Sequence, residues 1–422
     1  MSNAAILKKW TVMVYLAGDN NLDANGVTDL KEMKKIGSTP GMNIIAQFDR
    51  AGAGLPTKRY FIQKGTSLDD DVKENLGETN TGKPEFLLDF IKWGADNYPA
   101  DHYMLVLWNH GQGWDDTDIF AGERTRGLRL MRTNRIRNAF FKSSVVSTAK
   151  LSVTDAKIAR AILIDDDAKD FLDSLELKKV LTDAKTYLKR KIDILGMDAC
   201  LMSMAEVTYQ MLNNVSYTVG SEETEPLDGW PYDTILGQLA DKPETSPREL
   251  SKIIVKKYIE FYKVTGEAVT QSACDLMALA RFANAVKAFA EALKAGLADA
   301  RTLALIVNAR NRVQEFQVSD NIDLINLCQL LVNSTVPIAI ANACEGVIAT
   351  VKKASGMVFS SGYNDESMNQ SNGVAIYFPT RVLSPLYARL DFTKKTGWGE
   401  FLNAYIAATR TQRSILQAFQ NL

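Results

Sequence analysis

The sequence contains few cysteines and histidines and no long apolar run. Its 422 residues include four cysteines, which are scattered without paired spacing, so neither a disulfide framework nor a zinc site is indicated. No apolar run reaches the length of a membrane span, and residues 1–18 lack the order of a signal peptide. The 49 basic and 50 acidic residues nearly cancel, which gives no reason to expect nucleic acid or an anionic membrane as a partner.

Short apolar runs alternate with helical patterns in the first half of the chain. The strand-like runs are residues 11–16, 43–48, 59–63, 103–108, 192–197 and 217–220. Several of them are almost continuously apolar, as strands covered by helices on both faces are. The alternation therefore predicts α/β layers around a mostly parallel sheet.

The second half reads as mainly helical. Ser246 begins a capping box with Pro247 at the first helical position, which predicts a helix to about Tyr262. Residues 373–378 read as a strand that returns to the sheet before a last helix. We therefore expect a core over 1–245 with a long basic segment at 115–161, a helical subdomain over 246–354, and a return strand and terminal helix over 355–422.

Two reactive side chains follow the ends of two strand-like runs. His110 lies in the segment LVLWNHGQGW, and Cys200 lies in KIDILGMDACLM. Adjacent parallel strands end at the same edge of a sheet, where α/β proteins build their sites. If these strands are neighbours, Cys200 and His110 face each other as a nucleophile and its base. The other histidine, His102, precedes the same strand as His110 and is expected at the opposite edge.

The residues around this pair predict further details. A helix beginning near Leu201 would place the Cys200 thiol at a helix N-terminus, which favours the thiolate. We assign the N–H groups of Gly111 and Cys200 to an oxyanion hole, because glycine lets the backbone approach a substrate closely. The alternatives are a small buried cysteine and a loop histidine held by hydrogen bonds. No third residue that would orient the imidazole can be identified, so we expect a dyad.

Four segments in this order resemble the clostripain-like cysteine peptidases, relatives of caspases, gingipains and legumains. They are WTVMVYLAGDNNLD from Trp10, LVLWNHGQGW from Leu105, ILGMDACLMSMAEV from Ile194 and SEETEPLDGWPY from Ser221. Residues 373–379 and 398–402 are also similar to that family, so the resemblance covers most of the chain. It implies a caspase-like α/β core with a C-terminal extension, endopeptidase activity after Arg or Lys, and Cys200 and His110 as the catalytic pair.

A basic P1 side chain needs a paired anion when it leaves water. Asp198 matches the position to which the resemblance assigns this role, and its alternative role is to cap the helix expected near Leu201. Asp228 is a second candidate for the P1 pocket. Three glutamates either line the rim of the cleft or are simply solvated: Glu222, Glu223 and Glu225.

The basic segment 115–161 lies between the two members of the predicted pair. A connection of this length is usually functional or mobile. The resemblance implies activation by self-cleavage in this segment, and we expect the cut after Arg124 or Arg126, soon after the histidine loop. The alternative is a solvated basic helix or loop.

The predicted chemistry requires no cofactor. The acidic clusters at 18–23 and 165–167 carry the oxygen ligands that calcium prefers, but neither has the ligand spacing of a known loop, and turn and cap roles explain both. Some clostripain-like enzymes depend on calcium, so a chelator has to test whether this protein requires it. The cluster at 18–23 has the wrong charge for phosphate, which argues against a flavodoxin-like domain.

The expected partners are peptides or proteins with Arg or Lys at P1, and we expect a monomer. The resemblance suggests a secreted or periplasmic protein. The main alternative is a catalytically silent binding protein whose acidic cleft holds basic peptides.

Overall fold

The computed structural model describes residues 7–52, 54–114, 162–352 and 355–420, with side chains described as far as residue 411. In these ranges nine strands form one sheet in the order β12-β10-β9-β8-β5-β1-β2-β3-β4. The central strands from β9 to β2 are parallel, and two antiparallel strands extend the sheet at each end. The predicted α/β fold is confirmed, with its parallel part confined to the centre of the sheet.

Each predicted strand of the first half overlaps an observed one. The strands of the main sheet are β1 Lys8–Gly18, β2 Met42–Arg50, β3 Thr57–Phe61, β4 Val72–Gly77, β5 Ala100–Trp108, β8 Ile192–Asp198, β9 Val215–Gly220, β10 Val269–Asp275 and β12 Val358–Asn364. The helices that follow or precede them are α1 Asp23–Ile36, α2 Pro84–Asn97, α5 Ser174–Leu188, α6 Ala205–Gln210, α7 Tyr232–Asp241 and α8 Pro247–Thr265. A small hairpin is formed by β6 Ile162–Asp165 and β7 Asp170–Leu172.

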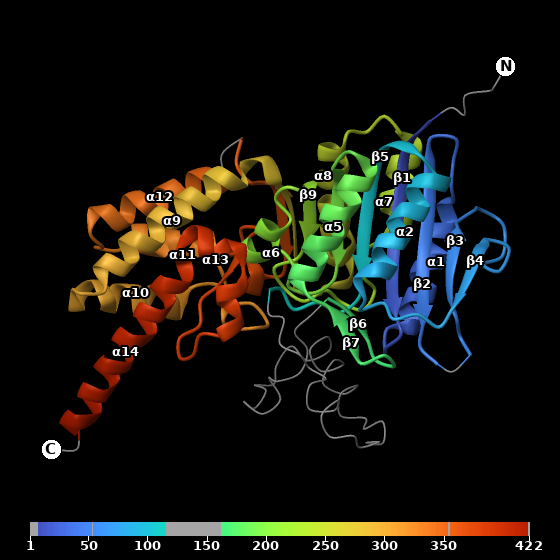
Figure 1. Ribbon diagram of the computed structural model, residues 1–422. Helices are drawn as coiled ribbons and strands as arrows, with labels where there is room; N and C mark the ends of the chain where they lie inside the picture. The colour runs from blue at the N-terminus through green and yellow to red at the C-terminus, as the bar shows by residue number, and fades with distance from the viewer. Residues whose placement is uncertain (1–6, 53, 115–161, 353–354, 421–422) are drawn as a thin grey trace, which may run out of the picture.

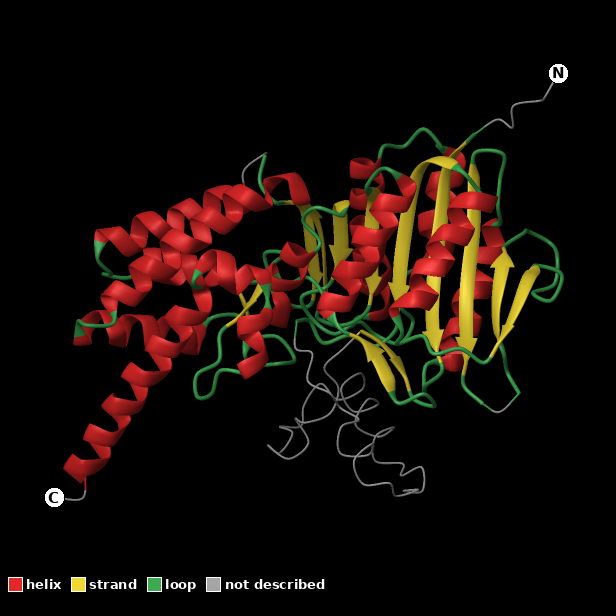
Figure 2. Cartoon of the chain, in the orientation of Figure 1, coloured by secondary structure: helices red, strands yellow, loops and turns green. Residues whose placement is uncertain are grey.

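Helices cover both faces of the sheet, as Figures 1 and 2 show. Met13 and Tyr15 of β1 pack in the same apolar cluster as α2 and α5, whereas Val12 and Val14 pack with α1, α7 and α8. Because successive side chains of a strand point to opposite faces, burial on both sides requires a continuous apolar run. The start of α8 is as predicted, since Ser246 Oγ accepts a hydrogen bond from the N–H of Glu249.

A helical group lies beyond β12, at the left of Figure 1. It contains α9 Leu279–Gly296, α10 Ala300–Arg312, α11 Leu324–Val332, α12 Ile338–Lys352, α13 Asp391–Thr396 and α14 Trp398–Gln420, with the short strands β11 Asn321–Asp323 and β13 Ala375–Tyr377. Within the described residues, every helix is too short or too polar to cross a lipid bilayer.

The strand that returns to the main sheet is not the predicted one. Residues 375–377 pair with β11 in a separate two-stranded sheet, and β12 joins the main sheet beside β10. A strand within residues 373–378 is confirmed as β13, but its predicted place in the main sheet was wrong, because its apolar residues pack in the same cluster as the helical group. β12 is an edge strand with a largely polar sequence, which gives little apolar signal.

Glu206 of α6, the helix that follows β8, bonds to the helical group. Its Oε1 accepts hydrogen bonds from the N–H of Tyr377 at 3.0 Å and the hydroxyl of Tyr387 at 2.7 Å. Burial raises the pKa of this carboxyl from 4.5 to about 7. The folded protein therefore holds a proton on Glu206 that the unfolded chain releases at lower pH, and the associated stability is lost as pH rises through about 7.

We expect Glu206→Gln to flatten the pH dependence of stability. The amide keeps an acceptor oxygen for both tyrosine donors and has no charge to bury, so at pH 8 it removes a penalty of about 3 kcal/mol at most. Urea unfolding of both proteins at pH 5 and pH 8 measures this difference. An equal loss of stability in the two proteins between these pH values would show that Glu206 does not titrate as described.

Candidate active site

The two predicted reactive residues follow neighbouring strands. β5 and β8 are adjacent and parallel, with Trp108 paired to Asp198, so His110 and Cys200 each lie two residues beyond this pair. Both line one cavity at the carboxyl edge of the sheet. His102 pairs with Trp10, near the start of β1, and therefore lies at the opposite edge of the sheet. The Nδ1 atom of His102 lies 3.3 Å from Asp193 Oδ1. The predicted adjacency and the opposite placement of His102 are both confirmed.

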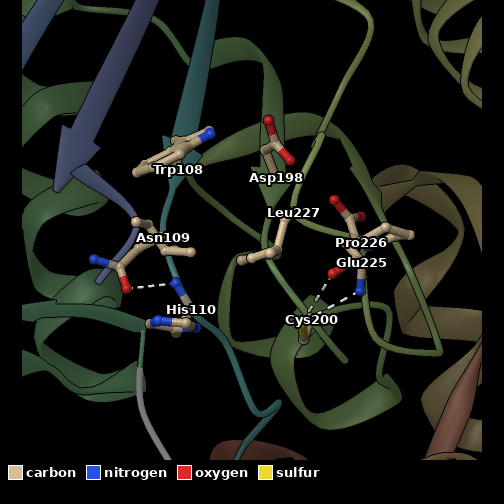
Figure 3. Close-up of a pocket in the computed structure, with 10 residues that line it drawn as sticks. Trp108, Asn109, His110, Asp198, Cys200, Glu225, Pro226 and Leu227 are labelled. Atoms are coloured by element: carbon tan, nitrogen blue, oxygen red, sulfur yellow. Dashed lines mark hydrogen bonds between the residues drawn. The ribbon is translucent and has the colours of Figure 1, made fainter. Parts of the chain in front are cut away.

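The cavity between the two residues is small in this structure. Its volume of about 30 Å³ has room for about one or two water molecules and not for a lysine or arginine side chain. Part of its wall comes from the loop after β9, which contributes Glu225, Pro226 and Leu227. Figure 3 shows the Leu227 side chain in the space between Asp198 and the two reactive residues. The loop after β9 therefore limits the space that is left for a large side chain.

Cys200 lies in a turn and not at the start of a helix. Leu201 has a φ of 64°, and α6 begins at Ala205, so the prediction of a helix near Leu201 was wrong. The residues after the cysteine bond to other loops, with Leu201 N–H donating to Glu223 O and Ser203 N–H donating to Ser221 O. These contacts tie the turn to the loop after β9.

The sulfur is held by the loop after β9. Cys200 Sγ accepts a hydrogen bond from the N–H of Glu225 at 3.2 Å, and the thiol lies 3.7 Å from Glu225 O. Burial raises the pKa of the Cys200 thiol to about 12, and the Glu225 N–H opposes this shift only in part. The expected thiolate at a helix N-terminus is therefore not what this structure contains. A neutral thiol needs a base to remove its proton.

His110 is buried and lines the same cavity as the thiol. Burial lowers the pKa of the imidazole to about 4, so it is neutral at neutral pH and is a weaker proton acceptor than a solvated histidine. The ring Nε2 of His110 lies 2.8 Å from Oδ1 of Asn21, in the loop after β1. The backbone N–H of His110 donates to Asn109 Oδ1. The sequence did not identify Asn21 as an orienting residue. One feature could have pointed to Asn21. It follows the end of β1, and β1 is the strand that pairs with β5 on the side opposite β8.

Gly111 packs directly against the cysteine turn. A Cβ at this position would lie 2.7 Å from Cys200 O and 3.0 Å from the Ala199 side chain, so only glycine fits without displacement. The structure thus places the backbones of the two predicted oxyanion donors, Gly111 and Cys200, in contact. Their role as donors stays a prediction.

Asp198 is buried at the end of β8 and lines the cavity. It accepts hydrogen bonds from the hydroxyl of Tyr232 at 2.8 Å and the N–H of Trp230 at 3.3 Å, and its carboxyl group is hydrogen-bonded to that of Glu225. Since no helix begins near Leu201, the alternative role of Asp198 as its cap was wrong.

The Asp198 and Glu225 carboxyl groups are buried side by side, so they do not both carry a full charge. Burial raises the pKa of Asp198 to about 6, and burial together with the neighbouring Asp198 charge raises the pKa of Glu225 well above its ordinary value. The pair therefore holds one proton at neutral pH, mainly on Glu225, and one negative charge. This charge lies beside Cys200, inside the cavity wall.

The remaining predicted residues lie elsewhere. Asp228 is exposed and is not among the residues that line the cavity. Glu222 and Glu223 are buried and point to the helical group, accepting from the N–H groups of Gly373 and Gln317. The self-cleavage candidates Arg124 and Arg126 lie outside the described residues.

The two acidic clusters have structural roles. Asp165, the last residue of β6, accepts from the N–H groups of Thr81 and Ala168, and Asp23 forms an ion pair with Arg50. Burial raises the pKa of Asp19 to about 8, so this carboxyl holds a proton at neutral pH. Within the described ranges, no group of three or more histidine, cysteine, aspartate or glutamate residues is arranged to hold a metal.

A sequence model of the clostripain family matches residues 14–140 and 149–405. The chain belongs to the clostripain family. Clostripain from Hathewaya histolytica is 30% identical over 232 residues, which are 50% of this chain and 37% of clostripain. The chain thus aligns with little more than a third of the length of that curated relative. The recognition of a cysteine peptidase family from four short segments is confirmed.

Solved structures support the same fold. An inactive zymogen of a C11 protease from Parabacteroides distasonis has a TM-score of 0.65 at 20% identity, covering 92% of this chain and 98% of that one. A secreted C11 cysteine protease from Bacteroides thetaiotaomicron, bound to an irreversible peptide inhibitor, has a TM-score of 0.63 at 19% identity, covering 93% and 99%. Both extend over the core and the helical group of this clostripain-family chain.

Proposed function

We propose that this protein is a cysteine endopeptidase that cleaves peptide bonds after Arg or Lys, with Cys200 as the nucleophile and His110 as the general base. The observation that carries the proposal is that Cys200, His110 and the Asp198 carboxylate, from two neighbouring parallel strands, line a single cavity. Membership of the clostripain family supports the same chemistry.

The mechanism starts from a neutral thiol and a neutral imidazole. His110 takes the Sγ proton as the sulfur attacks the scissile carbonyl, and the oxyanion forms beside the N–H groups of Gly111 and Cys200. The imidazolium then protonates the leaving amine, which yields a thioester. A water molecule, deprotonated by His110, hydrolyses the thioester and restores the free thiol.

Asp198 is the proposed receptor for the P1 side chain. A guanidinium or ammonium group in this pocket would meet the negative charge that Asp198 shares with Glu225, so its own desolvation is offset by a buried ion pair. Leu227 has to leave the cavity for the P1 side chain to reach this pair. No cofactor enters any of these steps.

A P1 peptide library, read with and without a calcium chelator, tests the function. We expect cleavage after Arg or Lys to exceed cleavage after uncharged residues by at least about a hundredfold, as a paired buried charge predicts. Binding of basic peptides without turnover under all these conditions would favour the alternative of a catalytically silent binding protein. Loss of cleavage on chelation alone would add a metal requirement to the proposal.

Self-cleavage between the two catalytic residues is a further part of the proposal. We expect the wild-type protein, incubated alone, to be cut after Arg124 or Arg126 into two fragments, and Cys200→Ala to stay intact. Gel electrophoresis and intact-mass measurement of both proteins check this. Fragments in both samples would indicate a contaminating protease, and fragments in neither would contradict self-cleavage.

A further inference from the structure

The loop after β1 reaches the imidazole of His110. Asn21 Oδ1 lies 2.8 Å from His110 Nε2. An amide oxygen offers lone pairs and no proton, so the hydrogen bond requires the proton to be on Nε2. The neutral imidazole that donates from Nε2 has its basic lone pair on Nδ1.

We infer that Asn21 is a positioning residue for the peptidase reaction: it holds His110 in the tautomer whose Nδ1 exchanges a proton with the Cys200 thiol. The inference rests on the proposed function, because it needs His110 as the base. During acylation the thiol proton passes to Nδ1 and then to the leaving amine, while the Nε2 proton stays hydrogen-bonded to Asn21. The proton count is unchanged at the end of each turnover.

The backbone around Asn21 is fixed by contacts that it shares with the histidine loop. Asn20 Nδ2 donates to Ala17 O at 2.9 Å and to Ile164 O at 3.0 Å. Asn109, the residue before His110, donates through its own Nδ2 to the same two carbonyl oxygens. The loop after β1 and the loop after β5 are therefore tied to common acceptors. This arrangement gives the contact between the amide and the imidazole a fixed geometry.

An amide suits this position better than a carboxylate would. His110 lies in a buried environment that favours the neutral imidazole. A carboxylate at the same distance would stabilise the imidazolium before substrate arrives, whereas an amide orients the ring without adding charge. Asn21 thus orients His110 and leaves it able to accept the thiol proton.

The kinetic test compares Asn21→Ala with Asn21→Asp and with a matched control. We expect Asn21→Ala to lower kcat about 10- to 100-fold with KM changed less than about threefold, because a misoriented base affects the chemical step. Asn21→Asp keeps an acceptor oxygen but adds a charge that stabilises the imidazolium, so it should keep the Nε2 proton and recover kcat only in part. The control is Asn43→Ala, which removes a buried amide that donates to Thr11 Oγ1 at the opposite edge of the sheet. It should lower stability and leave kcat within about twofold.

A spectroscopic test separates orientation from mere stability. The chain has two histidines, so ¹⁵N-labelling of histidine gives two ring systems, and His102→Gln identifies that of His110. We expect wild-type His110 to carry its proton on Nε2, and Asn21→Ala to mix the two tautomers. A wild-type proton on Nδ1, or an unchanged tautomer and kcat in Asn21→Ala, would overturn the inference. The proposed function would still stand if wild type cleaved after Arg or Lys and Cys200→Ala did not.

Discussion

Replacing Cys200 by Ala is expected to abolish turnover of an Arg- or Lys-containing peptide, with a loss in kcat on the order of 10⁵-fold or more. The methyl group cannot form the thioester, and no other thiol can take its place because Cys274, Cys328 and Cys344 are buried. Steady-state kinetics with a chromogenic Arg substrate measures the loss.

The fold should survive this change. Cys200 is half-buried and lies in a turn, where its sulfur accepts one backbone hydrogen bond, so we expect the midpoint of thermal unfolding to shift by only a few degrees. Cys344→Ala, a cysteine in the helical group, is the matched control and should keep activity within about twofold. Turnover by Cys200→Ala within tenfold of wild type would exclude Cys200 as the nucleophile.

Replacing Asp198 by Asn should give the second largest effect. The variant keeps the shape of the side chain and removes the charge that a basic P1 group would pair with. Losing one partner of a buried ion pair costs about 2–4 kcal/mol, so kcat/KM for Arg and Lys substrates should fall about 30- to 1000-fold. Cleavage of a peptide with an uncharged P1 residue should change much less.

Stability has to be measured beside specificity at this position. Asp198 also accepts hydrogen bonds from Trp230 and Tyr232, so the variant should lose about 1–2 kcal/mol of unfolding free energy. Asp233→Asn, which removes the partly exposed partner of Lys35, is the control for a carboxylate outside the cavity. If Asp198→Asn lowered stability and left the preference for Arg and Lys unchanged, Asp198 would have a structural role only.

The centre of the fold was predictable because it depends on a strong local signal. Strands β1, β5 and β8 are buried on both faces, and their continuous apolar runs mark them in the sequence. The placement of His110 and Cys200 followed from these strands, since residues beyond parallel neighbours meet at one edge. Ser246 was equally clear, because a cap followed by Pro247 is a local pattern.

The parts that were missed depend on contacts between distant segments. The sequences of β10 and β12 are VTQSACD and VFSSGYN, and their polar residues interrupt any apolar period. These segments form strands because they pair with each other and extend the edge of the sheet. The turn after Cys200 replaces a helix because Leu201 and Ser203 bond to the loop after β9. The contact from Asn21 to His110 spans 89 residues, which no local pattern reveals.

The energetic state of the site was also beyond the sequence. A helix N-terminus at Cys200 predicted a lowered thiol pKa, and burial raises it instead, although the hydrogen bond from the Glu225 N–H opposes the shift. Likewise, no sequence pattern predicted that Leu227 lines the cavity with Cys200 and His110. Both features depend on where the loop after β9 lies, which is set by contacts between segments far apart in the sequence.

Covalent labelling followed by peptide mass spectrometry tests most directly whether Cys200 and His110 act together in one pocket. The wild-type protein is treated with an irreversible thiol-reactive peptide ketone that carries Arg at P1. We expect a single adduct on the peptide that contains Cys200, formed at least about a hundredfold more slowly in His110→Ala. An adduct on another cysteine, or a labelling rate of Cys200 that does not change when His110 is replaced, would contradict a shared catalytic site.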